Sequence, residues 1–253
     1  AIKKMKEMIS NGIIGDLQYI YSNRLNLGRI RSEENVFWSL APHDISIFQY
    51  FIESQPVKIN STGGVFLQSN IHDTTITILE YPENIKCHIF VSWLHPFKEH
   101  RLVVIGSQGM ISFEDSFENK PLKLYLKGFD MSNKVPEKKD GPVKVIEFEK
   151  TMPLEEELKY FIRHLDGSPM DISNADNAIE VVDILEDLIN KLNPSAVIIT
   201  TPRFVQDFDF LSKTFRHTIN DKELSHMFLE TKMQTKNIIQ NWWVRYLNLL
   251  SIT

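Results

Sequence analysis

The chain has 253 residues, 42% hydrophobic and 11% aromatic, which is enough apolar material for one large core or two unequal ones. Its formal net charge of -5 and its scattered lysines exclude a broad basic surface and disfavour nucleic acid as a partner. No apolar run approaches the roughly 20 residues of a membrane helix, residues 1–6 lack the features of a secretory signal, and the single cysteine, Cys87, fits a reducing compartment. We therefore expect a cytoplasmic protein without a membrane partner.

Helical periodicity is present from the first residues. Ile2, Met5 and Ile9 share one face, and Gly12 stands where a C-terminal cap belongs. Ala1 is neither an initiator nor a capping residue, so we expect the chain to open inside an element and to lack a preceding segment.

A strand-like run from Leu17 to Leu25 leads into a polar loop that contains Gly28, Arg29 and Arg31. Pro42 is well placed as an early residue of the helix that follows. Apolar residues at helical spacing predict the buried face of that helix: Ile45, Phe48 and Ile52.

After Pro56 the apolar period changes to two, which predicts a series of strands. Residues 82–84 and 106–109 supply turns between neighbours, so we expect an antiparallel sheet with hairpin connections. The predicted strands are Val57–Phe66, Thr74–Tyr81, Ile85–Leu94, Leu102–Gly106 and Met110–Phe113, with Leu122–Leu126 and Val143–Phe148 as two further strands around an exposed loop.

Two helices are predicted next, at about Leu154–Leu165 and Asn174–Leu192. Strands followed by helices indicate an α+β fold, with an open, mostly antiparallel mixed sheet and helices on one face. We assign residues 1–193 to this domain and residues 194–253 to a separate, mainly helical tail. The second helix carries a continuous apolar stripe: Ala178, Val181, Val182, Leu185 and Leu188.

Common catalytic and cofactor motifs are missing. No G-x-G-x-x-G follows a predicted strand, no Cys or His cluster has zinc spacing, and no serine stands in a G-x-S-x-G elbow. The sequence thus predicts no metal site and no phosphate cradle of its own. His95 and His100 flank residues 96–99, which read as a bend, and we expect both histidines at the surface or in a turn.

The informative segment is NRLNLGRIR at residues 23–31, followed by EENVFWSLAPHDIS at residues 33–46. Here the sequence resembles the Gfo/Idh/MocA superfamily of oxidoreductases, and within it the branch that acts on nucleotide-linked amino sugars. The resemblance covers residues 1–192 and not the tail. Further pieces resemble the family in the same order: residues 1–17 its helix leading out of a Rossmann domain, 73–93 and 95–115 its central sheet, and 161–186 its last helices.

This resemblance implies the substrate-binding half of an NAD(H)-dependent enzyme that takes a hydride from a sugar carbon. It also implies that residues 1–12 are the remnant of a helix joining a missing Rossmann domain, and that the chain is inactive and binds no NAD(H) by itself. A sugar or nucleotide sugar, and a separate Rossmann-domain chain, are the implied partners. Two alternatives stay open: a non-catalytic sugar-binding or assembly module, and a truncated gene product.

His43 is the candidate catalytic residue. Imidazole titrates near neutral pH, and a helix N-terminus would lower its pKa and favour the proton-accepting form. In the family an acidic residue commonly stands four places before this histidine, whereas this chain has Ser39. A structural histidine at a helix start is the alternative interpretation.

The candidate substrate-binding residues surround His43 in the motif. Guanidinium groups suit a diphosphate or sugar hydroxyls, and Trp38 could stack on a base or a sugar. Solvated loop charges and a core tryptophan are the alternatives. The candidates are Arg24, Asn26, Arg29, Arg31, Trp38 and Ser39.

One face of the sheet remains without helices in this prediction. Its alternating residues, such as those of Ile85–Trp93, need cover, so we expect a homo-oligomer formed through the open face.

Overall fold

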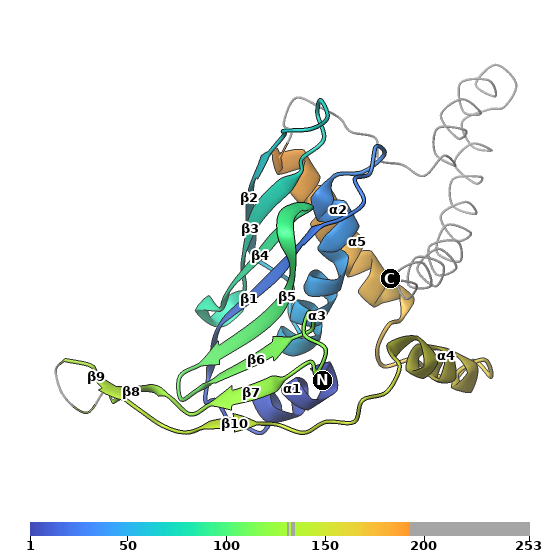
Figure 1. Ribbon diagram of the computed structural model, residues 1–253. Helices are drawn as coiled ribbons and strands as arrows, with labels where there is room; N and C mark the ends of the chain where they lie inside the picture. Colours follow the sequence, from blue (N-terminus) through green and yellow to red (C-terminus); the bar gives the residue numbers. More distant parts are fainter. Residues whose placement is uncertain (131, 133–134, 193–253) are drawn as a thin grey trace, which may run out of the picture. The chain divides into compact units, whose positions relative to one another are not determined.

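The computed structural model describes residues 1–130, 132 and 135–192 (Figure 1). The predicted tail of residues 194–253 lies outside the described residues. Residues 1–150 and 181–192 form one compact unit, and residues 151–180 belong to a second one. The elements are α1 (Ile2–Ser10), β1 (Leu17–Leu27), α2 (Val36–Leu40), α3 (Pro42–Ile52), β2 (Lys58–Gly64), β3 (Thr74–Glu80), η1 (Pro82–Asn84), β4 (Lys86–Ser92), β5 (Leu94–Gly106), β6 (Met110–Glu114), β7 (Leu122–Tyr125), β8 (Gly128–Asp130), β9 (Glu137–Lys139), β10 (Val143–Val145), α4 (Pro153–Arg163) and α5 (Ala175–Leu192).

The first unit is built on an eight-stranded sheet with the order β10-β7-β6-β5-β1-β4-β3-β2 among the described residues. All neighbours are antiparallel except β1 and β4, which run parallel. The predicted α+β fold with a mostly antiparallel mixed sheet is confirmed.

The position of β1 departs from a simple series of hairpins. This strand lies between β4 and β5, and the single residue Trp93 joins those two strands beyond its end. Leu25 pairs with Ser92 on β4, and Leu27 pairs with Leu94 on β5. Period-two patterns report individual strands and contain no information on insertion of a distant strand, so the sequence could not show this arrangement.

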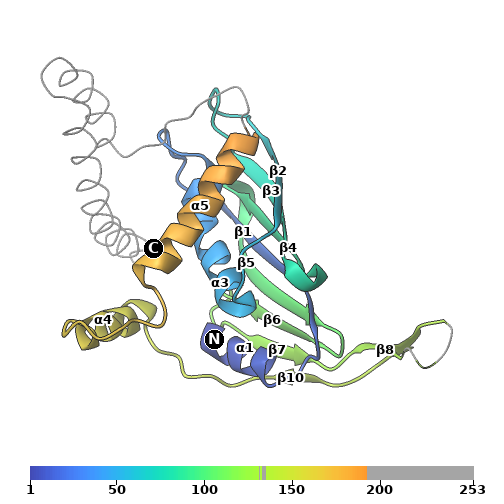
Figure 2. The same cartoon turned by 180° about the vertical axis from the view of Figure 1, so that it is seen from behind.

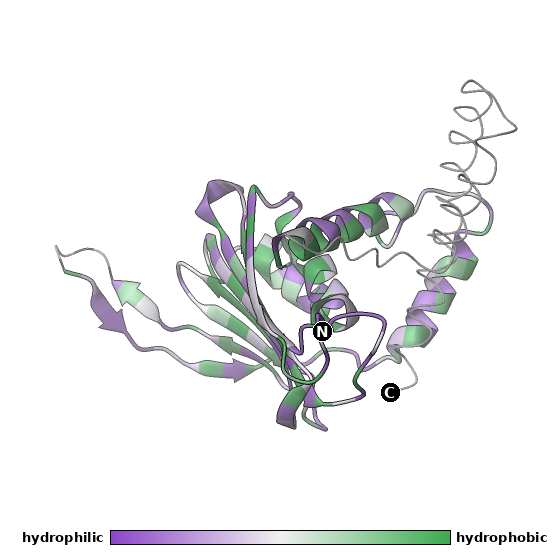
Figure 3. Cartoon of the chain, turned by 90° about the horizontal axis from the view of Figure 1, so that it is seen from above, coloured by the Kyte–Doolittle hydropathy of each residue, from purple (hydrophilic) through white to green (hydrophobic). Residues whose placement is uncertain are grey.

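Helices cover one face of the sheet, as predicted. Figure 3 shows the helices of the first unit on one side of the strands, and Figure 2 shows residues 181–192 of α5 on the same side as α2 and α3. Strand residues that face this side alternate with residues of the open face. The buried ones are Ile20, Ile59, Leu79, Cys87, Ile89, Val91, Leu102, Val104, Ile111, Leu122 and Leu124.

Two helices begin and end close to their predicted limits. Gly12 follows α1 with a φ of 67°, a left-handed conformation that glycine adopts at little cost. Met5 and Met8 are the buried residues of α1, so its buried face is rotated from the predicted one. Pro42 occupies the first turn of α3, where Phe51 is buried in addition to the expected Ile45 and Phe48.

The short helix α2 was not expected. Asn35 caps it, and its side-chain oxygen accepts a hydrogen bond of 3.0 Å from the backbone N–H of Trp38. Its five residues are too few to show helical periodicity in the sequence.

The C-terminal helices agree with the prediction. Within the described residues α4 and α5 begin and end within two residues of the expected limits. Val182 is only partly buried. The buried stripe of α5 is Ala178, Val181, Ile184, Leu185, Leu188 and Ile189.

The expected bend at residues 96–99 is wrong. These residues belong to β5, which runs unbroken from Leu94 to Gly106. The pairing of β5 with β1 shifts register between Leu25 and Leu27, and Pro96 falls at this irregularity. Proline is tolerated in a strand at such a bulge because its missing N–H is not needed by the ladder.

Asp73 ties together the loops at one end of the sheet. Its side chain is fully buried and accepts three hydrogen bonds. The backbone N–H groups of Phe66 and Leu67 donate to one oxygen at 2.7 and 2.9 Å. The indole N–H of Trp93 donates to the other at 2.7 Å. The carboxylate therefore fastens the loop between β2 and β3 to the link between β4 and β5.

We predict that Asp73→Ala lowers the free energy of unfolding by about 3 kcal/mol, because it leaves three N–H donors without their acceptor. Trp93→Phe removes only one of the donors and should cost about half as much. Urea denaturation followed by circular dichroism measures both. An Asp73→Ala variant with the wild-type unfolding midpoint would contradict this role.

Candidate functional site

An ion pair between β1 and α3 forms the centre of the candidate site. Arg24 donates from Nε to Oδ2 of Asp44 at 3.0 Å and from Nη2 to Oδ1 at 3.1 Å. The Ser22 hydroxyl donates to the same Oδ1 at 2.5 Å. The Asp44 side chain is 2% exposed and that of Arg24 19%. Two donors of the Arg24 guanidinium are therefore committed to the protein, and its charge is balanced.

His43 precedes Asp44 in the first turn of α3, where its backbone position follows from the cap at Ala41 and from Pro42. The side chain is partly buried. Burial lowers the pKa of His43 to about 4, and the positive charge of Arg24 acts in the same direction. The imidazole is thus neutral near pH 7 and can accept a proton. The lowered pKa has the direction that we expected, but its main causes are burial and Arg24 and not the helix N-terminus.

A second imidazole lies in the same cluster. His100 on β5 is directly opposite Arg24 on β1, so both side chains project from the same face of the sheet. Burial lowers the pKa of His100 to about 4, with Arg24 and then Lys98 acting in the same direction. Its Nε2 is buried and has no hydrogen-bond partner among the described residues.

Sequence reasoning missed His100 because it treated residues 96–99 as a bend. The signal that could have found it is the strand alternation itself, since Leu102 and Val104 are buried on the same face. Asp115 lies close by, and its backbone N–H donates to the His100 carbonyl at 2.8 Å.

The other predicted residues lie on β1, on α2 and in the loop between them. Asn26 is partly buried, and its side chain covers Gly28, where any Cβ would stand 2.5 Å from the amide oxygen. Arg29 is exposed, Trp38 is partly buried, and Ser39 is buried. None of these contacts places Asn26, Arg29 or Trp38 against His43.

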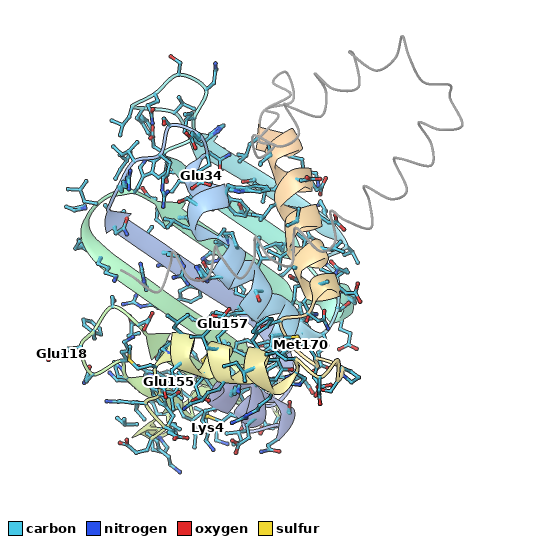
Figure 4. The ribbon with its side chains drawn as sticks, turned by 90° about the vertical axis from the view of Figure 1, so that its right-hand side faces the viewer. Lys4, Glu34, Glu118, Glu155, Glu157 and Met170 are labelled. Atoms are coloured by element: carbon cyan, nitrogen blue, oxygen red, sulfur yellow. The ribbon has the colours of Figure 1, made fainter. Side chains whose placement is uncertain are left out.

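Glu34 links two of the predicted residues and was missed by sequence reasoning. Figure 4 shows it just ahead of α2. Its carboxylate lies 3.7 Å from Nε of Arg31 and accepts a hydrogen bond from the Ser39 side chain. Burial raises the pKa of Glu34, although Arg31 and Ser39 oppose the shift. Glutamate in a charged loop carries no distinguishing signal in a single sequence.

The described residues contain no group of three or more His, Cys, Asp or Glu side chains that could hold a metal ion. Over the same part of the chain, no helix is both long and apolar enough to cross a membrane.

The fold corresponds to the C-terminal domain of a family of oxidoreductases. Residues 2–112 match the model of the GFO/IDH/MocA C-terminal domain. The family resemblance inferred from the sequence for residues 1–192 is therefore confirmed over residues 2–112. A search of curated proteins gave no match.

Solved structures share the fold. UDP-N-acetylglucosamine 3-dehydrogenase GnnA from Acidithiobacillus ferrooxidans is 16% identical with a TM-score of 0.60, over 76% of this chain and 61% of that one. Aldose-aldose oxidoreductase from Caulobacter crescentus, complexed with glycerol, is 10% identical with a TM-score of 0.63, over 77% and 59%. An inositol dehydrogenase homolog from Azotobacter vinelandii, complexed with NAD⁺, is 13% identical with a TM-score of 0.57, over 78% and 61%. The chain thus spans about three fifths of the length of these structures.

The neutral imidazoles predict a loss of stability in mild acid. Above pH 6.5 both rings are neutral in the folded and in the unfolded chain and contribute no pH dependence. As the pH falls from 6.5 towards 4, the unfolded chain binds protons that the folded chain excludes, so the folded state is destabilised. We expect about 1 kcal/mol for each histidine at pH 5 after allowance for solvent screening.

The double variant His43→Gln, His100→Gln should lose this part of the pH dependence. Urea unfolding at pH 7 and at pH 5 measures it for both proteins. An equal loss of stability in the wild type and in the double variant would show that other groups cause the acid sensitivity.

Proposed function

We propose that this chain is the substrate-binding part of an NAD(H)-dependent oxidoreductase that acts on a nucleotide-linked amino sugar. The observation that carries the proposal is the neutral, partly buried imidazole of His43 beside the Arg24–Asp44 pair. It stands in a domain whose fold is shared with sugar dehydrogenases. A cytoplasmic location remains part of the proposal.

His43 supplies the proton chemistry of the proposed reaction. Oxidation of a sugar hydroxyl to a carbonyl removes a proton from oxygen and a hydride from carbon. A neutral imidazole accepts the proton, and its burial keeps it neutral over the physiological range. Protonation creates a positive charge that the nearby Asp44 carboxylate stabilises only in part, because that carboxylate is already paired with Arg24. His43 is therefore suited to accept the proton transiently and to release it.

NAD⁺ would accept the hydride, but the described residues do not fit this cofactor. A dinucleotide is held by a glycine-rich turn between a strand and a helix, with the pyrophosphate at the helix N-terminus. The sequence of β1 and α2 has no such turn, and a polar loop with the single Gly28 separates them. The NAD⁺ complex of the inositol dehydrogenase homolog supports the cofactor assignment for the complete enzyme.

The loop between β1 and α2 is proposed to bind the nucleotide diphosphate. Arg29 and Arg31 are exposed, and guanidinium groups bind phosphate oxygens in pairs. Trp38 and Asn26 are partly buried at the two ends of this loop, where stacking and hydrogen bonding to the substrate are possible. The dehydrogenase for UDP-N-acetylglucosamine among the similar structures supports an amino sugar as the substrate class.

A non-catalytic sugar-binding module is the second candidate. Ser39 favours it, because a hydroxyl bonded to Glu34 stands where a catalytic partner of His43 is expected from the resemblance. Both candidates bind the sugar nucleotide, and only the enzyme depends on the proton-accepting ability of His43.

We predict that His43→Ala lowers turnover on the order of 10²-fold when a related dinucleotide-binding domain is supplied by fusion, which is the usual scale of general acid-base help. The KM for UDP-N-acetylglucosamine should change far less. Arg29→Ala is the matched control, with a higher KM and nearly unchanged turnover. Steady-state NADH formation measures both, and wild-type turnover of His43→Ala from pH 6 to 9 would remove its catalytic role.

The open face of the sheet is proposed to bind a second copy of this chain. The Tyr21 ring stacks on His88 with centroids 5.2 Å apart, and the Tyr19 hydroxyl hydrogen-bonds Nδ1 of His88 at 2.5 Å. Ile76 and Ile78 on β3 expose 48% and 45% of their surface on the same face. Rings held in place beside exposed aliphatic side chains suit a self-complementary contact.

The double substitution Ile76→Glu, Ile78→Glu should shift the chain towards monomer, because it places charges opposite each other in a symmetric contact. Val57→Glu, at an equally apolar and 70% exposed position outside the strands, is the control. Sedimentation velocity over a range of concentrations gives the result. A wild-type chain that is monomeric at high micromolar concentration would overturn the proposed dimer.

A further inference from the structure

The proposed reaction assigns a role to His43 but none to the neighbouring His100. His100 has a buried Nε2 that meets no partner among the described residues. An unsatisfied buried nitrogen costs free energy, so such groups in folded proteins commonly bond a water molecule or a ligand. This atom lies in the cluster that also contains Arg24, Asp44 and His43.

The charges in this cluster favour an uncharged ligand group over an anionic one. The Arg24 guanidinium is bonded twice to Asp44, so the strongest cation of the site is already neutralised. Lys98 and Asp115 are further charges of opposite sign that act on His100. A phosphate brought into these surroundings would meet two uncharged imidazoles and a paired guanidinium, and its desolvation would not be offset. An uncharged polar group fits better.

The two imidazoles also select a hydroxyl among uncharged groups. A neutral imidazole has one N–H donor and one acceptor nitrogen, and a hydroxyl can bond to either, whichever tautomer is present. His43 comes from the start of α3 and His100 from β5, so they approach the Arg24–Asp44 pair from different elements. This arrangement offers hydrogen bonds to two hydroxyls of one small ring.

We infer that His100 is a second substrate-contacting residue, whose Nε2 hydrogen-bonds a hydroxyl of the sugar ring beside the hydroxyl that His43 deprotonates. This inference rests on the proposed function and deepens it. In this arrangement the two ends of the substrate bind to different parts of the site. The sugar lies against the neutral histidines, and the diphosphate lies against Arg29 and Arg31 on the exposed loop. His100 then fixes the orientation of the ring and rejects sugars that lack the second hydroxyl.

The test compares the binding of UDP-N-acetylglucosamine and of UDP to the full chain by calorimetry. The two ligands share the nucleotide and the diphosphate, and only the first carries the sugar. His100→Leu should weaken the binding of UDP-N-acetylglucosamine by 10- to 100-fold, the scale expected for a lost buried hydrogen bond. Its affinity for UDP should stay at the wild-type value.

His95→Leu is the matched control. His95 stands on the same strand and also has a buried nitrogen without a partner among the described residues, but its ring packs against Phe90 and Phe97. This variant should keep the wild-type affinity for both ligands. A general effect of losing a β5 histidine would lower all affinities alike, and that result would overturn the inference.

The remaining outcomes are equally decisive. Unchanged binding of UDP-N-acetylglucosamine by His100→Leu would overturn the contact, while a wild-type chain that binds neither ligand would instead refute the proposed function. If His100→Leu does not fold, the imidazole signals of the wild type are followed by NMR, with His100→Gln to assign them. The His100 signal should move with UDP-N-acetylglucosamine and not with UDP, and a signal that ignores the sugar nucleotide would refute the contact.

Discussion

The ion pair between Arg24 and Asp44 is the interaction on which the candidate site depends. Burying a carboxylate is costly unless its oxygens are paired. Here two guanidinium donors and the Ser22 hydroxyl satisfy Asp44. The pair fastens the first turn of α3 to β1 and thereby fixes His43. Burial lowers the pKa of both imidazoles, and the Arg24 guanidinium acts in the same direction, so this ion pair positions His43 and helps to keep both histidines neutral.

The insertion of β1 between β4 and β5 makes this contact possible. A strand in the middle of the sheet has neighbours on both sides, so a charged residue on it is shielded by backbone and side chains. Arg24 pairs with Val91 on one side and with His100 on the other. The hydrogen bond between Asp73 and Trp93 holds the β4–β5 link beyond the end of β1. Residues outside the histidine cluster thus help to hold the strands that carry it.

Most of the fold could be predicted from the sequence, and about half of the candidate site. Period-two and helical patterns are local, so they identified most of the strands, α3 and α5, but not the first half of β5 or the short strands β8 and β9. The motif around His43 supported the family resemblance, which is confirmed for residues 2–112. The partners of His43 depend on strand register, which connects residues distant in sequence. His100 joins the site only through the pairing of β1 with β5, and Asp44 only through the packing of α3 on β1. Glu34 needed the fold of a loop that has no periodicity at all.

The distribution of charge over the site follows from desolvation. An arginine deep in the domain must be paired, and Arg24 is. The arginines of the exposed loop stay hydrated and keep donors for a ligand, since Arg31 is 48% exposed and meets Glu34 only at 3.7 Å. Such a site suits a ligand with one charged and one uncharged end. The charged end would meet the hydrated guanidinium groups, and the uncharged end the neutral imidazoles. The proposed nucleotide sugar has this polarity, because its diphosphate is ionic and its sugar ring is not, so the different burial of the arginines would orient such a substrate before proton transfer.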